Sequence, residues 1–142
     1  MAQNLNAFFA QNAQKIETEK YVASTRFVDK DKALEWEIGC ITAGENNKIR
    51  QSCMTQKPVR GGKRGQFMPE FDANSYQAKI SAKCTIFPDL NDPELQNSYG
   101  VMSAEELIAT MLLPGEFEDY AARVLEVNGF KTETELVEEA KN

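Results

Sequence analysis

The signal that most constrains the fold of this chain is a helix-start motif that occurs three times. At 42–45, 103–106 and 132–135, a Ser or Thr stands three positions before a Glu. In this motif, the capping box, the hydroxyl and the carboxylate each accept a hydrogen bond from a backbone amide at the start of a helix. The three motifs therefore predict three helix starts in the central and C-terminal parts of the chain.

Other capping residues predict further helices. Asn4 precedes apolar residues at helical spacing and indicates an amphipathic helix over 5–17. Asp72 indicates a second helix, which Pro88 closes, and Pro93 favours one more helical turn. These helices would add to the three that the capping boxes start.

Glycine and proline predict where helices end. The helix that starts at Thr42 stops before Pro58, and the helix over 104–113 is broken by the Pro-Gly pair at 114–115. Gly129 is placed to end the following helix in a left-handed conformation. The chain therefore reads as a series of short helices.

One stretch, 20–41, has the pattern of a β-hairpin. Trp36, Ile38 and Cys40 alternate with acidic or small residues, as in a strand that has one buried and one solvent-exposed face. A lone two-stranded hairpin is marginal in water, so helices must cover its Trp36 face. We therefore expect an α+β fold, a mainly α-helical single domain over 1–142 with one N-terminal β-hairpin packed against helices.

Composition excludes several classes of function. The 16 basic and 22 acidic residues give a net charge of −6, which argues against nucleic acid as the main partner. No apolar run approaches the roughly 18–20 residues that span a bilayer, and the N-terminus lacks the basic opening of a secretory signal. Cys40, Cys53 and Cys84 are widely spaced and odd in number, which predicts reduced core thiols in a cytosolic protein.

The sequence offers no evident catalytic or metal-binding group. It contains no His, the commonest general base and a frequent metal ligand. The glycines of 61–65 do not form a phosphate-binding loop, because no Ser or Thr follows Lys63 and no strand precedes them. Adjacent acids such as Glu105 and Glu106 lie at helix starts, where the helix dipole favours anions. We therefore expect no enzyme, no cofactor and no metal.

Charge is divided between two parts of the chain. Six cations and no acid lie between Lys48 and Arg64, whereas 101–142 contains ten acids and three bases. Within the helical region expected over 42–142, a basic loop is predicted at 57–71. It is either a solvated loop or a site for a second copy or an acidic partner. The aromatic residue Phe67 beside these cations also makes single-stranded nucleic acid a weaker alternative as the partner of this loop. The cations assigned to this loop are Lys57, Arg60, Lys63 and Arg64.

Two predicted helices carry more apolar side chains than one core-facing stripe needs. Leu113 lies about 100° from the centre of its stripe, because successive helical residues turn by that angle. Core packing is the simplest interpretation of each residue, but the shared excess indicates a surface for apolar helices of another protein. On this hypothesis Leu113→Asp leaves the fold intact and weakens partner capture. The candidate partner-binding residues are Leu107, Ile108, Met111, Leu112, Leu113, Phe117, Tyr120, Phe8 and Phe9.

Four segments of the chain resemble one known family. They are EWEI (35–38), PVRGGKRGQFMPEFDANSYQAK (58–79), FPDLNDPELQNSYGVMSAEELIATMLLPGEF (87–117) and the ending LVEEAKN. These segments are similar to the XkdN-like phage tail assembly chaperones of tailed phages and defective prophages of Gram-positive bacteria. The resemblance covers nearly the whole chain, and its motifs are structural, so it implies no active-site residues.

The resemblance implies a non-enzymatic chaperone of the host cytoplasm that is absent from the mature virion. Such a chaperone coats the tape measure protein, a long, helical and aggregation-prone protein, until the tail tube polymerises around it. The implied partners are the tape measure protein, a frameshift-extended form of the chaperone, the tail tube protein and further copies in a homo-oligomer. A structural tail or baseplate component retained in the virion is the main alternative, and a small nucleic-acid-binding phage regulator is a lesser one.

Overall fold

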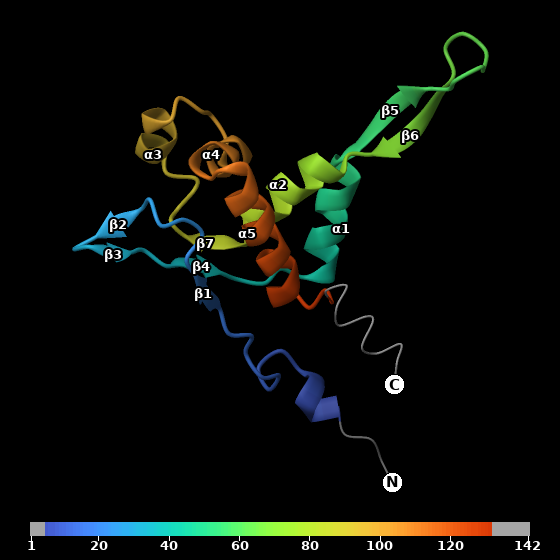
Figure 1. Ribbon diagram of the computed structural model, residues 1–142. Coiled ribbons are helices and arrows are strands. Elements are labelled where there is room, and N and C mark those ends of the chain that lie inside the picture. Colours follow the sequence, from blue (N-terminus) through green and yellow to red (C-terminus); the bar gives the residue numbers. More distant parts are fainter. Residues whose placement is uncertain (1–4, 132–142) are drawn as a thin grey trace, which may run out of the picture.

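The computed structural model describes residues 5–131, in which short strands and helices alternate (Figure 1). The strands are β1 (Glu19–Tyr21), β2 (Val28–Asp29), β3 (Lys32–Ala33), β4 (Trp36–Ile38), β5 (Met54–Pro58), β6 (Phe67–Phe71) and β7 (Thr85–Phe87). The helices are the 3₁₀-helix η1 (Leu5–Phe8) and the α-helices α1 (Ala43–Ser52), α2 (Ala73–Cys84), α3 (Pro93–Ser98), α4 (Ala104–Met111) and α5 (Pro114–Val127). The α+β fold class expected from the sequence is confirmed.

Two N-terminal strands and β7 form a small antiparallel sheet that packs against the helices. β4 is the central strand and pairs with β1 on one side and β7 on the other. Between β1 and β4 in the sequence, β2 and β3 pair as an inner hairpin whose turn residues, Lys30 and Asp31, both have positive φ. The hairpin predicted over 20–41 is therefore present, and β7 adds a strand that the sequence did not predict.

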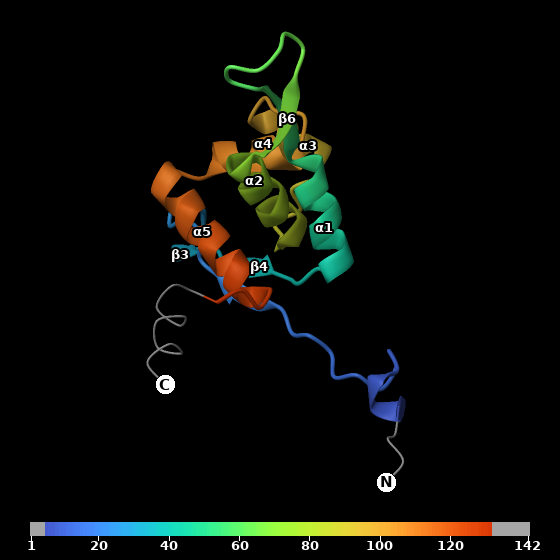
Figure 2. The same cartoon turned by 90° about the vertical axis from the view of Figure 1, so that its right-hand side faces the viewer.

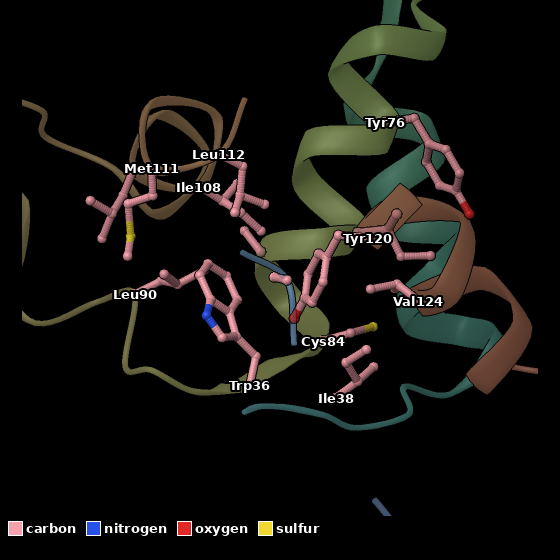
Figure 3. Packing of buried hydrophobic residues seen from close by; sticks show 14 of the residues in the cluster. Trp36, Ile38, Tyr76, Cys84, Leu90, Ile108, Met111, Leu112, Tyr120 and Val124 are labelled. Carbon is pink, nitrogen blue, oxygen red and sulfur yellow. The ribbon is translucent and has the colours of Figure 1, made fainter. Parts of the chain in front are cut away.

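Trp36 and Tyr120 lie within the hydrophobic core, between the sheet and the helices (Figure 3). Their ring centroids are 5.2 Å apart with an edge-to-face angle of 67°, a favoured geometry for aromatic pairs. The hydroxyl of Tyr120 also lies 2.6 Å from the hydroxyl of Thr85, which joins α5 to β7. Other fully buried side chains come from the sheet, α2, α4, α5 and the loop after β7, and include Ile38, Ile80, Leu90, Leu107, Ile108 and Val124.

The capping residues predicted for α1, α2 and α4 are in place. The Thr42 hydroxyl accepts from the Glu45 amide at 3.1 Å, and the Glu45 carboxylate accepts from the Thr42 amide at 3.2 Å. Asp72 and Ser103 each accept a hydrogen bond from the third residue of the helix that follows. These local signals fixed three helix starts, whereas the motif predicted at 132–135 lies outside the described residues.

The end of α5 has the hydrogen bonds of a Schellman motif. Gly129 has a φ of +92°, and its amide donates to the carbonyl of Glu126. The amide of Phe130 donates to the carbonyl of Leu125 at 2.9 Å. These two bonds satisfy carbonyls that the helix leaves unpaired, which confirms the left-handed stop predicted at this glycine.

The helix predicted over 5–17 is wrong. Only Leu5–Phe8 is helical, as one 3₁₀ turn, and none of residues 5–18 is buried. Figures 1 and 2 show this segment, which we call the N-terminal arm, leading away from the sheet and the helices. A short helix without tertiary contacts is marginal in water, so the apolar spacing of the arm is insufficient to make it helical.

The basic loop predicted at 57–71 is also wrong in part, because β5 and β6 pair as a hairpin. The register places Met54 opposite Phe71 and Pro58 opposite Phe67, so only residues 59–66 connect the strands. Proline is unsuited to a central strand but is tolerated in a two-stranded sheet, where each strand has a free edge. Pro58 in β5 and Pro69 in β6 therefore led a prediction from composition to assign a loop instead of two strands.

The Pro-Gly pair at 114–115 starts a helix rather than ending one. Pro114 is the first residue of α5, where a missing amide hydrogen has no cost. The break after α4 falls at Leu112 and Leu113, which both have extended backbone. Likewise, α2 ends at Cys84, four residues before Pro88, because the chain enters β7.

The burial of Cys84 predicts a loss of stability at alkaline pH. Burial raises the pKa of this thiol from 9.0 to about 11, because its thiolate is poorly solvated. Between these values the unfolded chain loses the proton and the folded chain keeps it. The free energy of unfolding therefore falls by about 1.4 kcal/mol per pH unit in this window. Urea unfolding across the window measures this slope. Cys84→Ala should reduce this slope, most clearly below pH 10, because burial also raises the pKa of Tyr120 from 10.0 and adds to the slope at higher pH. An equal slope in both proteins below pH 10 would contradict the assignment.

Candidate partner-binding surfaces

Most of the apolar residues predicted to bind a partner lie in the core instead. Figure 3 shows four of them, Ile108, Met111, Leu112 and Tyr120, in the same buried cluster as Trp36. Phe117 is half-buried and packs against the same cluster. The expectation that they line an open groove is therefore wrong, and core packing accounts for them. Of the predicted partner-binding residues, those that are at most 5% exposed are Leu107, Ile108, Met111, Leu112 and Tyr120.

Leu113 differs from its neighbours, because 55% of its surface is exposed at the corner between α4 and α5. It is the N-cap residue of α5, yet its side chain makes no capping hydrogen bond. Its amide donates to the Glu116 carboxylate at 2.8 Å, and this bond holds the pKa of that carboxyl below its ordinary value. Since Leu is unfavourable at an N-cap, its exposed side chain is a candidate for contact with another molecule.

Arg26 fixes the position of this corner against the N-terminal strands. Its guanidinium donates to the carbonyl of Met111 at the end of α4 and lies 3.7 Å from the carboxylate of Glu116 in the first turn of α5. The corner is thus held at both helix ends. Leu113 is presented on a defined part of the fold rather than on a free loop.

The other two apolar candidates lie on the N-terminal arm. Phe8 is 81% exposed and Phe9 is 48% exposed. Leu5 and Ile16, at 66% and 75%, are exposed on the same arm. The structure therefore separates the predicted apolar residues into a buried set on α4 and α5 and an exposed set at the corner and on the arm.

The four basic candidates lie on the β5–β6 hairpin and in its turn. Lys57 is on β5, with its ammonium 3.4 Å from the Glu70 carboxylate on β6. Arg60, Lys63 and Arg64 belong to the turn that joins the strands, and all three are exposed. Both views show the hairpin projecting from the ends of α1 and α2 (Figures 1 and 2). The structure thus gathers these cations on one projection.

The hairpin also carries apolar side chains that the sequence interpretation did not assign to a surface. Met54, Phe67 and Met68 are 44%, 58% and 52% exposed. The available signal was the alternation of apolar residues in Phe67–Phe71 opposite a second short segment, with a glycine-rich turn between them. Pro58 and Pro69 obscured it.

Three lysines face a groove between α1, α2 and the start of α4. Lys48, Lys79 and Lys83 line this space of about 490 Å³, in which Glu105 is the one acidic lining residue. The groove is suited to acidic groups rather than to a metal ion, and within residues 5–131 no group of three His, Cys, Asp or Glu is placed to hold one. No helix in that part of the chain is long and apolar enough to cross a membrane.

Comparison with known proteins identifies relatives along nearly the full length. Residues 5–141 match the family described as phage XkdN-like tail assembly chaperone protein. The phage-like element PBSX protein XkdN of Bacillus subtilis (strain 168) is 30% identical over 142 residues, which cover 98% of this chain and 94% of the relative. The uncharacterized protein YqbN of the same strain is 29% identical over 136 residues, which cover 93% of this chain and 89% of the relative.

A solved structure shares the fold. The crystal structure of the protein YqbN superposes with a TM-score of 0.78 at 22% sequence identity. The match covers 92% of this chain and 100% of that chain. The arrangement of helices and small sheets is therefore common to both proteins.

Two adjacent leucines give a matched test of the corner. Leu113→Ser supplies the missing N-cap acceptor and completes a capping box with Glu116, so we expect the free energy of unfolding to rise by about 0.5–1 kcal/mol. Leu112→Ser places a hydroxyl and a cavity in the core, and should lower it by more than about 2 kcal/mol. Urea unfolding of both variants measures these changes. A large loss of stability in Leu113→Ser would show that this side chain supports the core.

Proposed function

Because the chain belongs to the XkdN-like phage tail assembly chaperone family, we propose that it binds the tape measure protein and keeps it soluble for tail tube assembly. It acts in the host cytoplasm and is absent from the mature virion. Further copies of itself, its frameshift-extended form and the tail tube protein are proposed as additional partners in the same assembly step.

The observation that carries this proposal is the family match over residues 5–141, which includes every described element. The match therefore concerns the whole fold rather than a single motif. Family members are tail assembly chaperones, which are not a known class of enzyme. Binding, rather than chemistry on a substrate, is accordingly the activity to be explained.

Exposed apolar side chains at separate places on the surface support a binding role. Phe8 on the N-terminal arm, Leu113 at the α4–α5 corner and Phe67 on the hairpin are each more than half exposed. A protein that shields apolar segments of another needs such contacts, together with a charged exterior that keeps the complex in solution. The net charge of −6 is consistent with that exterior.

Co-expression tests this function directly. We expect the tape measure protein to precipitate when it is expressed alone and to co-purify as a soluble complex with this chain at moderate salt. The recovered complex is measured by affinity purification and sizing. If the chain purifies alone while the tape measure protein still aggregates, also when the frameshift-extended form is supplied, the proposed function is wrong.

The competing function, a structural tail or baseplate component, predicts a different fate for the chain. Mass spectrometry of purified particles should find the tail tube and tape measure proteins without this chain if it is a chaperone. Stoichiometric recovery of the chain in particles would instead identify a component of the virion.

A further inference from the structure

The β5–β6 hairpin has two chemically different faces. Residues that pair directly across an antiparallel sheet share a face, so the register places Met54, Pro58, Phe67, Pro69 and Phe71 on one side together with Gln56. The opposite side carries Thr55, Lys57, Met68 and Glu70, with the Lys57–Glu70 ion pair. We call these the apolar face and the ion-pair face of the hairpin.

The apolar face is anchored at its base and open along its length. Phe71 packs against Tyr76 with ring centroids 5.6 Å apart, and the Arg50 guanidinium lies 4.7 Å from the centre of the Phe71 ring. Met54, opposite Phe71 at the base, is 44% exposed, and Phe67, at the other end of the strands, is 58% exposed. A two-stranded hairpin is marginal in water without a covered face, so this arrangement calls for an occupant.

A groove at the base of the hairpin continues the apolar face onto α1. It measures about 460 Å³ and is lined by Asn47, Arg50, Gln51, Met54 and Phe71. It lies where the hairpin leaves α1, and its lining residues join the two elements. An occupant of the apolar face can therefore seat a side chain between α1 and β5.

The charge of this surface selects the occupant. Arg60, Lys63 and Arg64 lie at the tip and Arg50 at the base. The single acid of 54–71, Glu70, is paired with Lys57 on the ion-pair face. The apolar face is thus bordered by cations at both ends and contains no acid, which favours an acidic partner.

A second copy docked face to face conflicts with this charge. If two identical hairpins pack in parallel, the tip cations Arg60, Lys63 and Arg64 meet those of the other copy. If they pack antiparallel, each tip meets Arg50 at the base of the other. Like charges in contact oppose association in either case.

We propose that the apolar face of the β5–β6 hairpin holds an acidic amphipathic helix of the tape measure protein. This inference rests on the proposed function and names the surface that performs it. Five-residue strands extend over about 16 Å, which matches about three turns of a helix. The apolar stripe of the helix covers Met54 and Phe67, and its acidic residues pair with the cations at the tip and base.

Neighbouring residues on β6 provide a matched test in the full chain. Phe67 and Met68 have similar exposure but lie on opposite faces. We expect Phe67→Ser to lower the amount of co-purified tape measure protein by at least about tenfold, because it removes the aromatic side chain that the bound helix would cover. Met68→Ser should change it by less than about twofold. Both side chains are exposed, and thermal unfolding should confirm that both variants remain folded.

Charge variants test the acidic character of the occupant. A triple variant should lower capture of the tape measure protein about as much as Phe67→Ser does; it combines Arg60→Glu, Lys63→Glu and Arg64→Glu. Capture by the unaltered chain should weaken as the salt concentration rises. The control exchanges the ion pair on the other face, Lys57→Glu with Glu70→Lys, which preserves net charge. This exchange should leave capture unchanged.

The outcomes separate this inference from the proposed function. If the unaltered chain captures no tape measure protein, both this inference and the proposed function are wrong. Two results would show that only the hairpin assignment is wrong. In the first, Phe67→Ser captures as much tape measure protein as the unaltered chain. In the second, Phe67→Ser and Met68→Ser lose the same amount of capture. A changed oligomeric state of Phe67→Ser on sizing would identify a second copy as the occupant, and loss of capture after nuclease treatment would identify nucleic acid. Either result would overturn the proposal.

Discussion

The contact between Trp36 and Tyr120 is the interaction on which the rest of the structure depends. Tyr120, on α5, also lies 6.0 Å from Tyr21 of β1 between ring centroids and is hydrogen-bonded to Thr85 of β7. One side chain therefore touches all three strands of the sheet. The strands of this sheet have only three residues each and form few hydrogen bonds. The apolar contacts of the Tyr120 ring with these strands therefore stabilise the sheet.

This constraint decides which parts of the molecule are available to a partner. The inward residues of α4 and α5 are occupied in covering the sheet, and opening them would expose the core. The exposed apolar side chains that we propose for partner binding lie instead at the α4–α5 corner and on two elements that project from the core, the N-terminal arm and the β5–β6 hairpin (Figures 1 and 2). The fold thus separates the residues that maintain its structure from those that are free to bind.

Features set by local chemistry were predictable from the sequence, and features set by tertiary contacts were not. The caps at Thr42 and Asp72 and the stop at Gly129 depend on a few adjacent residues, and the structure contains all three. The arm has helical spacing without a surface to cover, and β6 is a strand despite Pro69. At the candidate site, the angular position of a residue on α4 could suggest exposure, but only packing could show which side chains the sheet already covers.

Hydrogen–deuterium exchange tests the central claim most directly, because it reports protection of each segment in the free chain and in its complex with the tape measure protein. If the core is complete in the free chain, complex formation should add protection at 54–71 and leave α4 unchanged. New protection of α4, with the hairpin unaffected, would show that the buried face of α4 opens to hold the partner and would contradict this account.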